Sequence, residues 1–204
     1  MIMDLTLDVG ELWKRMDRKS CRYAVNRAIM DGVKIKLNEN YEDFYVINCR
    51  FRDAKNLSSL PVTVDFMKKY GILFVAEFNG EIVAGAFFLG DTDVIRCIQH
   101  ASKRLESGRD KATLIGNASH LLIWEAMKYA KQKGIKEFDM GGYSTDSSLR
   151  YDYRFKRSFG GRVVKRFTYQ KYYSPFVYAY TVLGISRIVR KLLLMSKRLS
   201  KGMI

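Results

Sequence analysis

The stretch ILFVAEFNGEIVAGAFFLGDTDVIRCIQHA, residues 72–101, decides the fold expected for this chain. Its first two apolar runs are rich in β-branched and aromatic residues, which is typical of strands. Asn79-Gly80 joins them, and this pair accepts the positive φ angles of a type I′ turn. A second turn leads into a third run of the same kind. The pattern predicts a meander of antiparallel strands at residues 72–78, 81–89 and 94–101.

Before the meander, helices are expected. Apolar and basic residues alternate at helical spacing from Val9 to Asp31, and Gly32 ends that run. Pro61 suits the first turn of a later helix that closes at Gly71. The other elements predicted in this part are a strand at residues 33–37 and a helix at residues 41–55.

After the meander, the pattern predicts a helix at about residues 117–133, a strand at 135–140 and a last strand within 162–171. Helices, a meander, another helix and two strands together indicate an α+β fold. We expect a mixed, mainly antiparallel central sheet flanked by helices. The predicted domain covers residues 1–175, and residues 176–204 form a basic, amphipathic helical tail.

The composition limits the partners and the compartment. The chain has 204 residues, 48% of them hydrophobic, which is enough for a packed core. Its formal charge of +15 attracts polyanions such as nucleic acid, anionic lipid or an acidic carrier protein. Three widely spaced cysteines and two histidines argue for a reducing compartment and against a zinc site. With no export signal and no apolar run long enough for a bilayer, we expect a cytoplasmic protein, at most peripheral on the inner face of the membrane.

Two motifs follow the long predicted helix: Asp139-x-Gly-Gly at the end of a strand, and Phe155-Lys156 further on. In this order they resemble the second half of the Fem-type peptidyl aminoacyltransferases, the FemABX family within the GNAT-like acyltransferase superfamily. The resemblance covers nearly the whole chain and implies a GNAT-like fold and acyl transfer. Members of that family usually carry two GNAT-like subdomains, whereas this chain has the length of one. A homodimer would supply the second half; otherwise the acceptor is different and smaller.

In acetyl-CoA-binding GNAT proteins a glycine loop before the long helix holds the pyrophosphate. The matching positions here begin with Thr113, where those proteins have a cationic or amide residue. Free amides at the following helix start would still favour an anion. The alternative is a tight loop that serves packing only. The donor-binding residues predicted from this comparison are Arg109, Lys111, Thr113, Gly116, Asn117 and Ala118. Gly141 and Gly142 are added because paired glycines at a strand end allow close approach of a substrate.

The resemblance implies catalytic roles at Lys156, Phe155 and Asp139. An ammonium group at Lys156 could stabilise negative charge on the transferring carbonyl; the alternative is one cation of a solvated basic face. Asp139 could orient the attacking amine, or cap its own turn. Tyr143 could donate to a leaving group, and His100 could act as a general base.

The leading hypothesis is transfer of an aminoacyl group from aminoacyl-tRNA to an amine of a cell-envelope precursor. The rival is a GNAT N-acyltransferase that uses acyl-CoA or an acyl carrier protein to acylate an amino sugar or amino acid. A third reading is a non-catalytic RNA- or membrane-binding module. No tightly bound cofactor or metal is expected. The tail, residues 176–204, is predicted to dock on an anionic membrane, with core packing or a dimer contact as the alternatives.

Overall fold

The computed structural model describes residues 1–57, 61–142, 150–165, 167, 171, 173 and 174, without the side chains of residues 150–152. The chain divides into two units, Met1–Val164 and Lys165–Ile204. The first unit holds every element described below. The predicted amphipathic tail, residues 176–204, lies outside the described residues, so its role stays a prediction.

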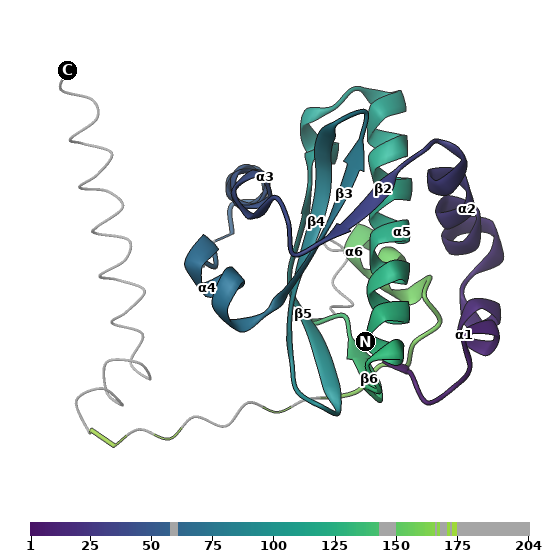
Figure 1. The fold of residues 1–204 in the computed structure, drawn as a ribbon, viewed down its shortest axis with the longest axis vertical. Coiled ribbons are helices and arrows are strands. Elements are labelled where there is room, and N and C mark those ends of the chain that lie inside the picture. The colour runs from purple at the N-terminus through teal and green to yellow at the C-terminus, as the bar shows by residue number, and fades with distance from the viewer. Residues whose placement is uncertain (58–60, 143–149, 166, 168–170, 172, 175–204) are drawn as a thin grey trace. The chain divides into compact units, whose positions relative to one another are not determined.

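In the described part of the chain, six strands form one sheet in the order β1-β6-β5-β4-β3-β2 (Figure 1). All neighbouring pairs are antiparallel except β5 and β6, which run parallel. Asn79 and Gly80 have φ angles of 51° and 78°, as the type I′ turn requires. The predicted meander and the α+β class are confirmed. The strands are β1 (Ile2–Asp4), β2 (Lys34–Leu37), β3 (Ile72–Phe78), β4 (Glu81–Gly90), β5 (Val94–Ser102) and β6 (Glu137–Asp139).

Helices cover both faces of this sheet (Figure 1). On one face lies the long helix α5, with α2 packed against it. The other face carries α3 and α4. The helices are α1 (Val9–Arg15), the π-helical turn η1 (Arg18–Arg22), α2 (Tyr23–Met30), α3 (Tyr41–Ala54), α4 (Val64–Tyr70), the 3-10 turn η2 (Lys103–Glu106), α5 (Arg109–Gln132) and α6 (Arg150–Arg157).

The single helix predicted for residues 9–31 is wrong, because the structure divides it at Met16 and Asp17. Met16 has an extended backbone that ends α1. The carboxylate of Asp17 then accepts a hydrogen bond from the backbone N–H of Ser20, at 2.8 Å, and starts a new helical segment. Asp17 is therefore a cap, which the apolar spacing alone did not reveal.

Two predicted helix starts also need correction. Thr63, not Pro61, caps α4, because its hydroxyl accepts a hydrogen bond from the N–H of Phe66. The long helix α5 begins at Arg109, two turns before the predicted start at Asn117. The predicted last strand within residues 162–171 is reduced to one bridge between Ile2 and Arg162 among the described residues. Neither β1 nor α6 was predicted.

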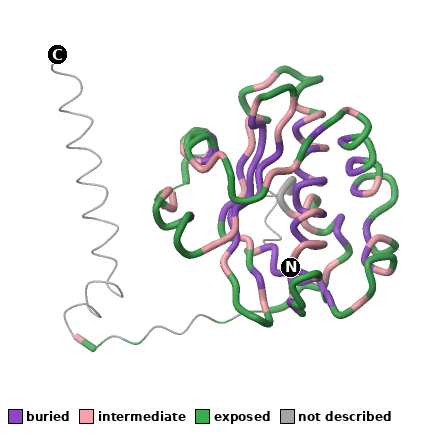
Figure 2. The backbone as a smooth tube through the Cα atoms, viewed as in Figure 1, coloured by how far each residue is buried: buried purple, intermediate pink, exposed green. Residues whose placement is uncertain are grey.

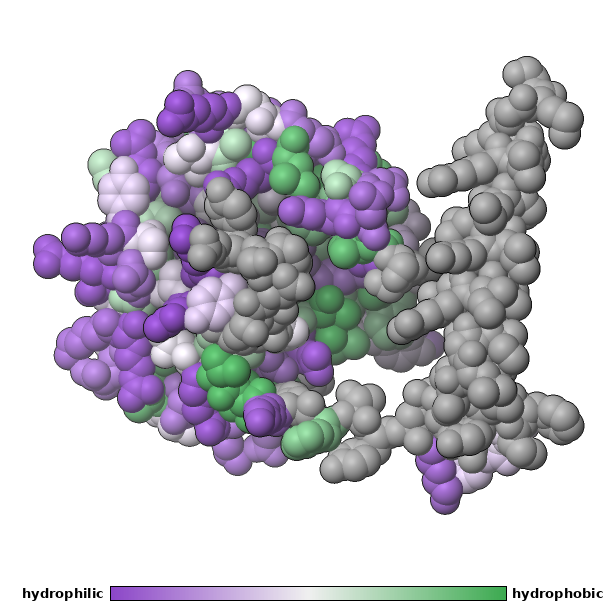
Figure 3. Space-filling model, turned by 180° about the vertical axis from the view of Figure 1, so that it is seen from behind, coloured by the Kyte–Doolittle hydropathy of each residue, from purple (hydrophilic) through white to green (hydrophobic). Residues whose placement is uncertain are grey.

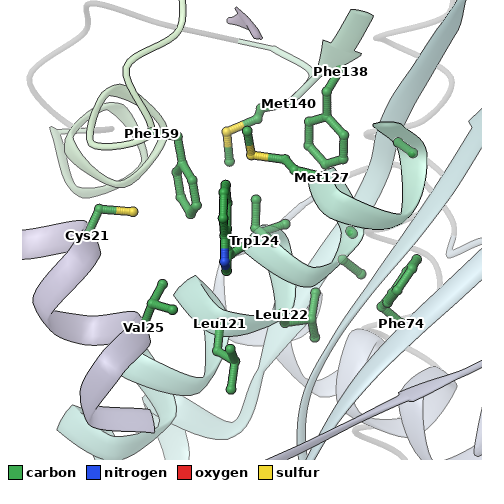
Figure 4. Close-up of a cluster of buried hydrophobic side chains, with 14 of the residues drawn as sticks. Cys21, Val25, Phe74, Leu121, Leu122, Trp124, Met127, Phe138, Met140 and Phe159 are labelled. Atoms are coloured by element: carbon green, nitrogen blue, oxygen red, sulfur yellow. The ribbon is translucent and has the colours of Figure 1, made fainter. Parts of the chain in front are cut away.

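The apolar core lies in two layers, one on each face of the sheet. Buried residues follow the central strands and the inner side of α5 (Figure 2). Phe159, which follows α6, reaches the larger layer beside Trp124 of α5, with Cys21 of η1 nearby (Figure 4). The face seen from behind is mostly hydrophilic, with scattered hydrophobic side chains (Figure 3). Burial of Phe159 thus ties the end of α6 to α5, on which the candidate site depends.

Candidate functional site

A pocket of about 420 Å³ opens where the end of β5 and η2 meet α3, α5 and α6. Its walls are mainly apolar and aromatic, with a few polar groups, as is common for small-molecule sites. Phe51 comes from α3, Lys55 lies just beyond the end of α3, and Phe155 comes from α6. The remaining lining residues are His100, Ala101, Ser102, Arg104, Leu105, Gly116, Ser119 and His120.

Two histidines and two phenylalanines form an aromatic cluster in this pocket. The ring of Phe155 stacks on His100, with centroids 5.2 Å apart, and meets His120 edge to face at 4.7 Å. On its other side His120 stacks against Phe159, at 5.6 Å. Phe155 therefore joins β5 to α5 through ring contacts, and it places both histidines at the same pocket.

His120 has a defined protonation pattern. Its Nδ1 lies 2.9 Å from the carbonyl oxygen of Gly116, which can only accept, so Nδ1 carries the proton and Nε2 is left as an acceptor. Burial lowers the pKa of His120 most strongly; the Gly116 carbonyl opposes this, and the positive charge of Arg104 lowers the pKa further. The hydroxyl of Ser158 lies 3.5 Å from Nε2, and it also lies 2.7 Å from the carbonyl of Phe155, to which it donates. The lowered pKa favours the neutral imidazole of His120, in which Nε2 is the nitrogen that can accept a proton.

The sequence reasoning placed His120 among packing or polar surface residues and missed this arrangement. Its partners Phe155 and Phe159 are more than 30 residues away along the chain. One signal was present: Phe155 and Phe159 are four residues apart, the spacing at which two side chains lie on the same face of a helical turn. His100, for which a general-base role was predicted, also lines the pocket; that role stays a prediction.

Asp139 caps its own turn, which is the alternative that the sequence left open. It is buried, and its Oδ1 accepts a hydrogen bond of 2.9 Å from the N–H of Gly141. Its Oδ2 lies 3.6 Å from Nε of Arg96. Gly141 has a φ of 78°, a backbone conformation that favours glycine. Asp139 and Gly141 therefore shape the end of β6, and neither is among the residues that line the pocket.

The side chains of Phe155 and Lys156 have different surroundings. Phe155 lines the pocket, whereas the ammonium group of Lys156 donates a hydrogen bond to the carbonyl of Gly142. Successive helical residues point about 100° apart, and these two side chains leave α6 in different directions. A catalytic role of Lys156 stays a prediction. Tyr143 lies outside the described residues.

The glycine loop predicted before the long helix does not exist, because residues 113–118 lie inside α5. Thr113 donates its hydroxyl proton to the carbonyl of Arg109, and Ala118 is buried in the core. Of the predicted donor-binding residues, Gly116 alone lines the pocket. Glycine inside a helix costs only about 1 kcal/mol relative to alanine, so Gly116 did not have to mark a boundary.

Ion pairs hold η2 and the start of α5 to the rest of the domain. Glu81 of β4 pairs with Lys103 at 2.7 Å and with Lys111 at 2.8 Å. These two lysines lower the pKa of Glu81 to about 2. Arg50 of α3 lies 3.6 Å from Glu106. The segment that forms one wall of the pocket is thus fixed to both β4 and α3.

No group of three or more His, Cys, Asp or Glu residues in the described part of the chain could hold a metal ion. Nor does any helix in the described ranges have the length and apolar character needed to cross a bilayer.

Residues 64–157, just under half of the chain, match the model of the GNAT acetyltransferase domain. The matched stretch runs from α4 to α6 and contains every pocket residue except Phe51 and Lys55. No curated protein matches the sequence.

Three solved structures show the same fold at low sequence identity. FemX has a TM-score of 0.61 and 14% identity, over 78% of this chain and 57% of its own. The C-terminal domain of a putative lysylphosphatidylglycerol synthetase from Agrobacterium fabrum has a TM-score of 0.58 and 14% identity, over 79% and 56%. An aminoglycoside N-acetyltransferase in complex with CoA has a TM-score of 0.50 and 12% identity, over 70% and 95%. The chain spans a little over half the length of the first two.

Proposed function

We propose that this chain, an acyltransferase of the GNAT type as the family match and the fold support, moves an aminoacyl group from aminoacyl-tRNA to an amine of a cell-envelope precursor. The observation that carries the reaction type is His120, held neutral by burial with Nδ1 bonded to Gly116. An attacking amine must lose a proton, and a neutral imidazole nitrogen accepts it.

In the proposed reaction, the acceptor nitrogen attacks the ester carbonyl of the donor. A C–N bond forms and the bond from the carbonyl carbon to the ribose oxygen breaks. The proton leaves the nitrogen, passes to Nε2 of His120 and is returned to the ribose oxygen as it departs. The rings of Phe155 and Phe51 line the pocket and reduce its water content, which strengthens charge interactions inside it.

The charge of the chain supports the tRNA donor. The chain carries 36 lysines and arginines against 21 aspartates and glutamates, an excess that suits a polyanion. The absence of a glycine loop at residues 113–118 removes the sequence feature that favoured coenzyme A. FemX and the lysylphosphatidylglycerol synthetase domain also share the fold, although at 14% identity they support the fold alone.

One observation favours the alternative, an N-acyltransferase that uses acyl-CoA or an acyl carrier protein to acylate an amino sugar or amino acid. The aminoglycoside N-acetyltransferase is matched over 95% of its own length, so one domain of this size forms that whole enzyme. FemX is matched over 57%. The shared fold therefore also supports transfer to a small acceptor such as an amino sugar or amino acid.

The test measures binding and transfer for both donors with the full chain. Charged tRNA, uncharged tRNA, acetyl-CoA and a long-chain acyl-CoA are titrated across a salt series, and labelled donors are then mixed with glucosamine, lysine and a peptidoglycan-precursor peptide. For tRNA we expect log affinity to fall with log salt by about 0.7 to 0.9 per phosphate contact, and labelled aminoacyl product to form. Acyl-CoA product without tRNA affinity would overturn the tRNA proposal and favour the alternative.

A further inference from the structure

The pocket that contains His120 has a one-sided charge. Two cations line it, Lys55 beyond the end of α3 and Arg104 in η2. No aspartate or glutamate is among its lining residues in the described part of the chain. A pocket lined by cations alone, with apolar walls, attracts anions and excludes like charge. The two cations are therefore placed to bind an anionic group in the pocket.

Arg104 differs from its charged neighbours in η2. Lys103 lies 2.7 Å from Glu81, and Glu106 lies 3.6 Å from Arg50, so both have partners on neighbouring elements. Arg104 has no ion pair and no hydrogen bond of its side chain among the residues that the structure describes. Since its neighbours fix the turn, the guanidinium is held at the pocket without using its own donors.

The absence of a side chain at Gly116 leaves space for the guanidinium of Arg104. A methyl group added at Gly116 would lie 3.6 Å from the guanidinium carbon of Arg104, so the guanidinium packs over the backbone of α5. The same positive charge also lowers the pKa of His120, which lies one turn further along α5. The guanidinium of Arg104 and the imidazole of His120, the proposed proton acceptor, therefore lie at the same part of the pocket.

We propose that the pocket binds a substrate through an oxyanionic group, a carboxylate or a phosphate, that pairs with Arg104 and Lys55. The flat guanidinium presents parallel N–H donors that match two oxygens of such a group, and a lysine ammonium adds a point charge. That this group belongs to a reacting substrate rests on the proposed acyl transfer. Either the acceptor amine or the donor can carry it.

Binding is tested first, without any acyl transfer. The chain has two histidines, so the ring signals of His120 and His100 are few and can be assigned in an NMR spectrum. Inorganic phosphate and acetate are added at constant ionic strength. We expect a saturable shift of the His120 signals with either anion, and a Kd at least tenfold weaker in Arg104→Gln. Lys55→Gln should weaken binding less, and Arg104→Lys should retain part of it.

Lys133→Gln is the matched control, because it removes one charge at the far end of α5. It should leave the Kd unchanged. Equal anion binding in the parent and in Arg104→Gln, or an equal loss in Lys133→Gln, would overturn the inference. This outcome would leave the acyltransferase proposal standing, because the measurement does not depend on transfer.

The source of the anionic group is then separated by kinetics. Glucosamine 6-phosphate is compared with glucosamine, alanine with alaninamide, and acetyl-CoA with the acetyl thioester of N-acetylcysteamine. If the acceptor carries the group, the charged acceptor has the higher kcat/KM, and Arg104→Gln removes that preference. If the donor carries it, the preference follows the phosphate-bearing donor instead. Arg104→Gln leaving every preference intact would contradict the proposal.

Discussion

Replacing His120 with phenylalanine separates proton transfer from packing. A phenylalanine ring keeps the contacts with Phe155 and Phe159, whose centroids lie 4.7 Å and 5.6 Å from the imidazole. The variant loses Nε2 and the 2.9 Å hydrogen bond from Nδ1 to Gly116. The lost hydrogen bond contributes about 1 kcal/mol to the free energy of unfolding, part of which the added apolar surface offsets. We therefore expect a folded protein without its proton acceptor.

General base catalysis typically contributes a factor of about 10² to 10⁴. His120→Phe should lower kcat/KM by that factor, which corresponds to about 2.7 to 5.4 kcal/mol of transition-state stabilisation. The pH dependence of activity gives a second test of the role of His120. Since burial lowers the pKa of His120 below 6.5, the parent should gain activity as the pH rises through this lowered pKa, and stay active above it. The variant should lack this rise.

The assay is transfer of a labelled acyl group from whichever donor gives product, from pH 4.5 to 8, with urea unfolding as the check on folding. His100→Phe is the comparison, because its ring also contacts Phe155, at 5.2 Å. We expect a smaller loss and an unchanged profile there. If His120→Phe kept kcat/KM within about threefold of the parent while His100→Phe lost the low-pH limb, His100 would be the base and the assignment of His120 would be refuted.

Three further predictions follow from the geometry. Lys156→Met should leave kcat within about tenfold, because its ammonium group contacts Gly142 instead of lining the pocket; a loss of about 10² or more would restore it as an oxyanion partner. Glu81→Gln should reduce the dependence of stability on pH in acid. With its pKa lowered to about 2, the ionised Glu81 stabilises the fold above pH 4.5, and this stabilisation is lost as the pH falls towards 2. If the urea midpoint depended on pH in the same way in the variant and the parent, this prediction would be contradicted. Gly85→Ala should destabilise by about 1 to 3 kcal/mol, because its Cβ would lie 2.3 Å from the buried Phe44 ring; Gly116→Ala, with only an ordinary contact at 3.6 Å, is the control and should be neutral or stabilising in urea unfolding.

The parts of the fold that the sequence predicted well depend on local chemistry. Asn79-Gly80 dictates its turn within two residues, and the strands of the hairpin follow from it. The predicted start of α5 is wrong because glycine is typical of helix boundaries, whereas this helix begins after Gly108 and contains Gly116 in its interior. The division at Asp17 was missed because one side-chain cap outweighed a continuous apolar spacing.

The candidate site was harder to predict, because its residues meet only in the folded chain. Phe155 was predicted and does line the pocket, yet its partners come from β5 and α5. Arg104 was not predicted, since a basic residue in a basic chain carries no distinguishing signal. Arg104 has no carboxylate partner in the described part of the chain, whereas Lys103 pairs with Glu81 and Glu106 pairs with Arg50. Such a contrast appears only when every neighbour has been placed.

The Asp139-x-Gly-Gly motif shows why a resemblance can identify a fold without identifying the chemistry. Asp139 accepts the N–H of Gly141, and a Cβ at Gly141 would lie 2.9 Å from the carbonyl oxygen of Cys97. The motif therefore lets the chain leave β6 in close contact with β5, which has to continue to His100 and Ser102 at the pocket. The observed contacts of this motif thus explain the course of the backbone and identify no acyl donor or acceptor. The residues proposed to bind the anionic group of the substrate, Arg104 and Lys55, lie outside the motif, in η2 and just beyond α3, so the motif by itself does not determine which substrate the pocket binds.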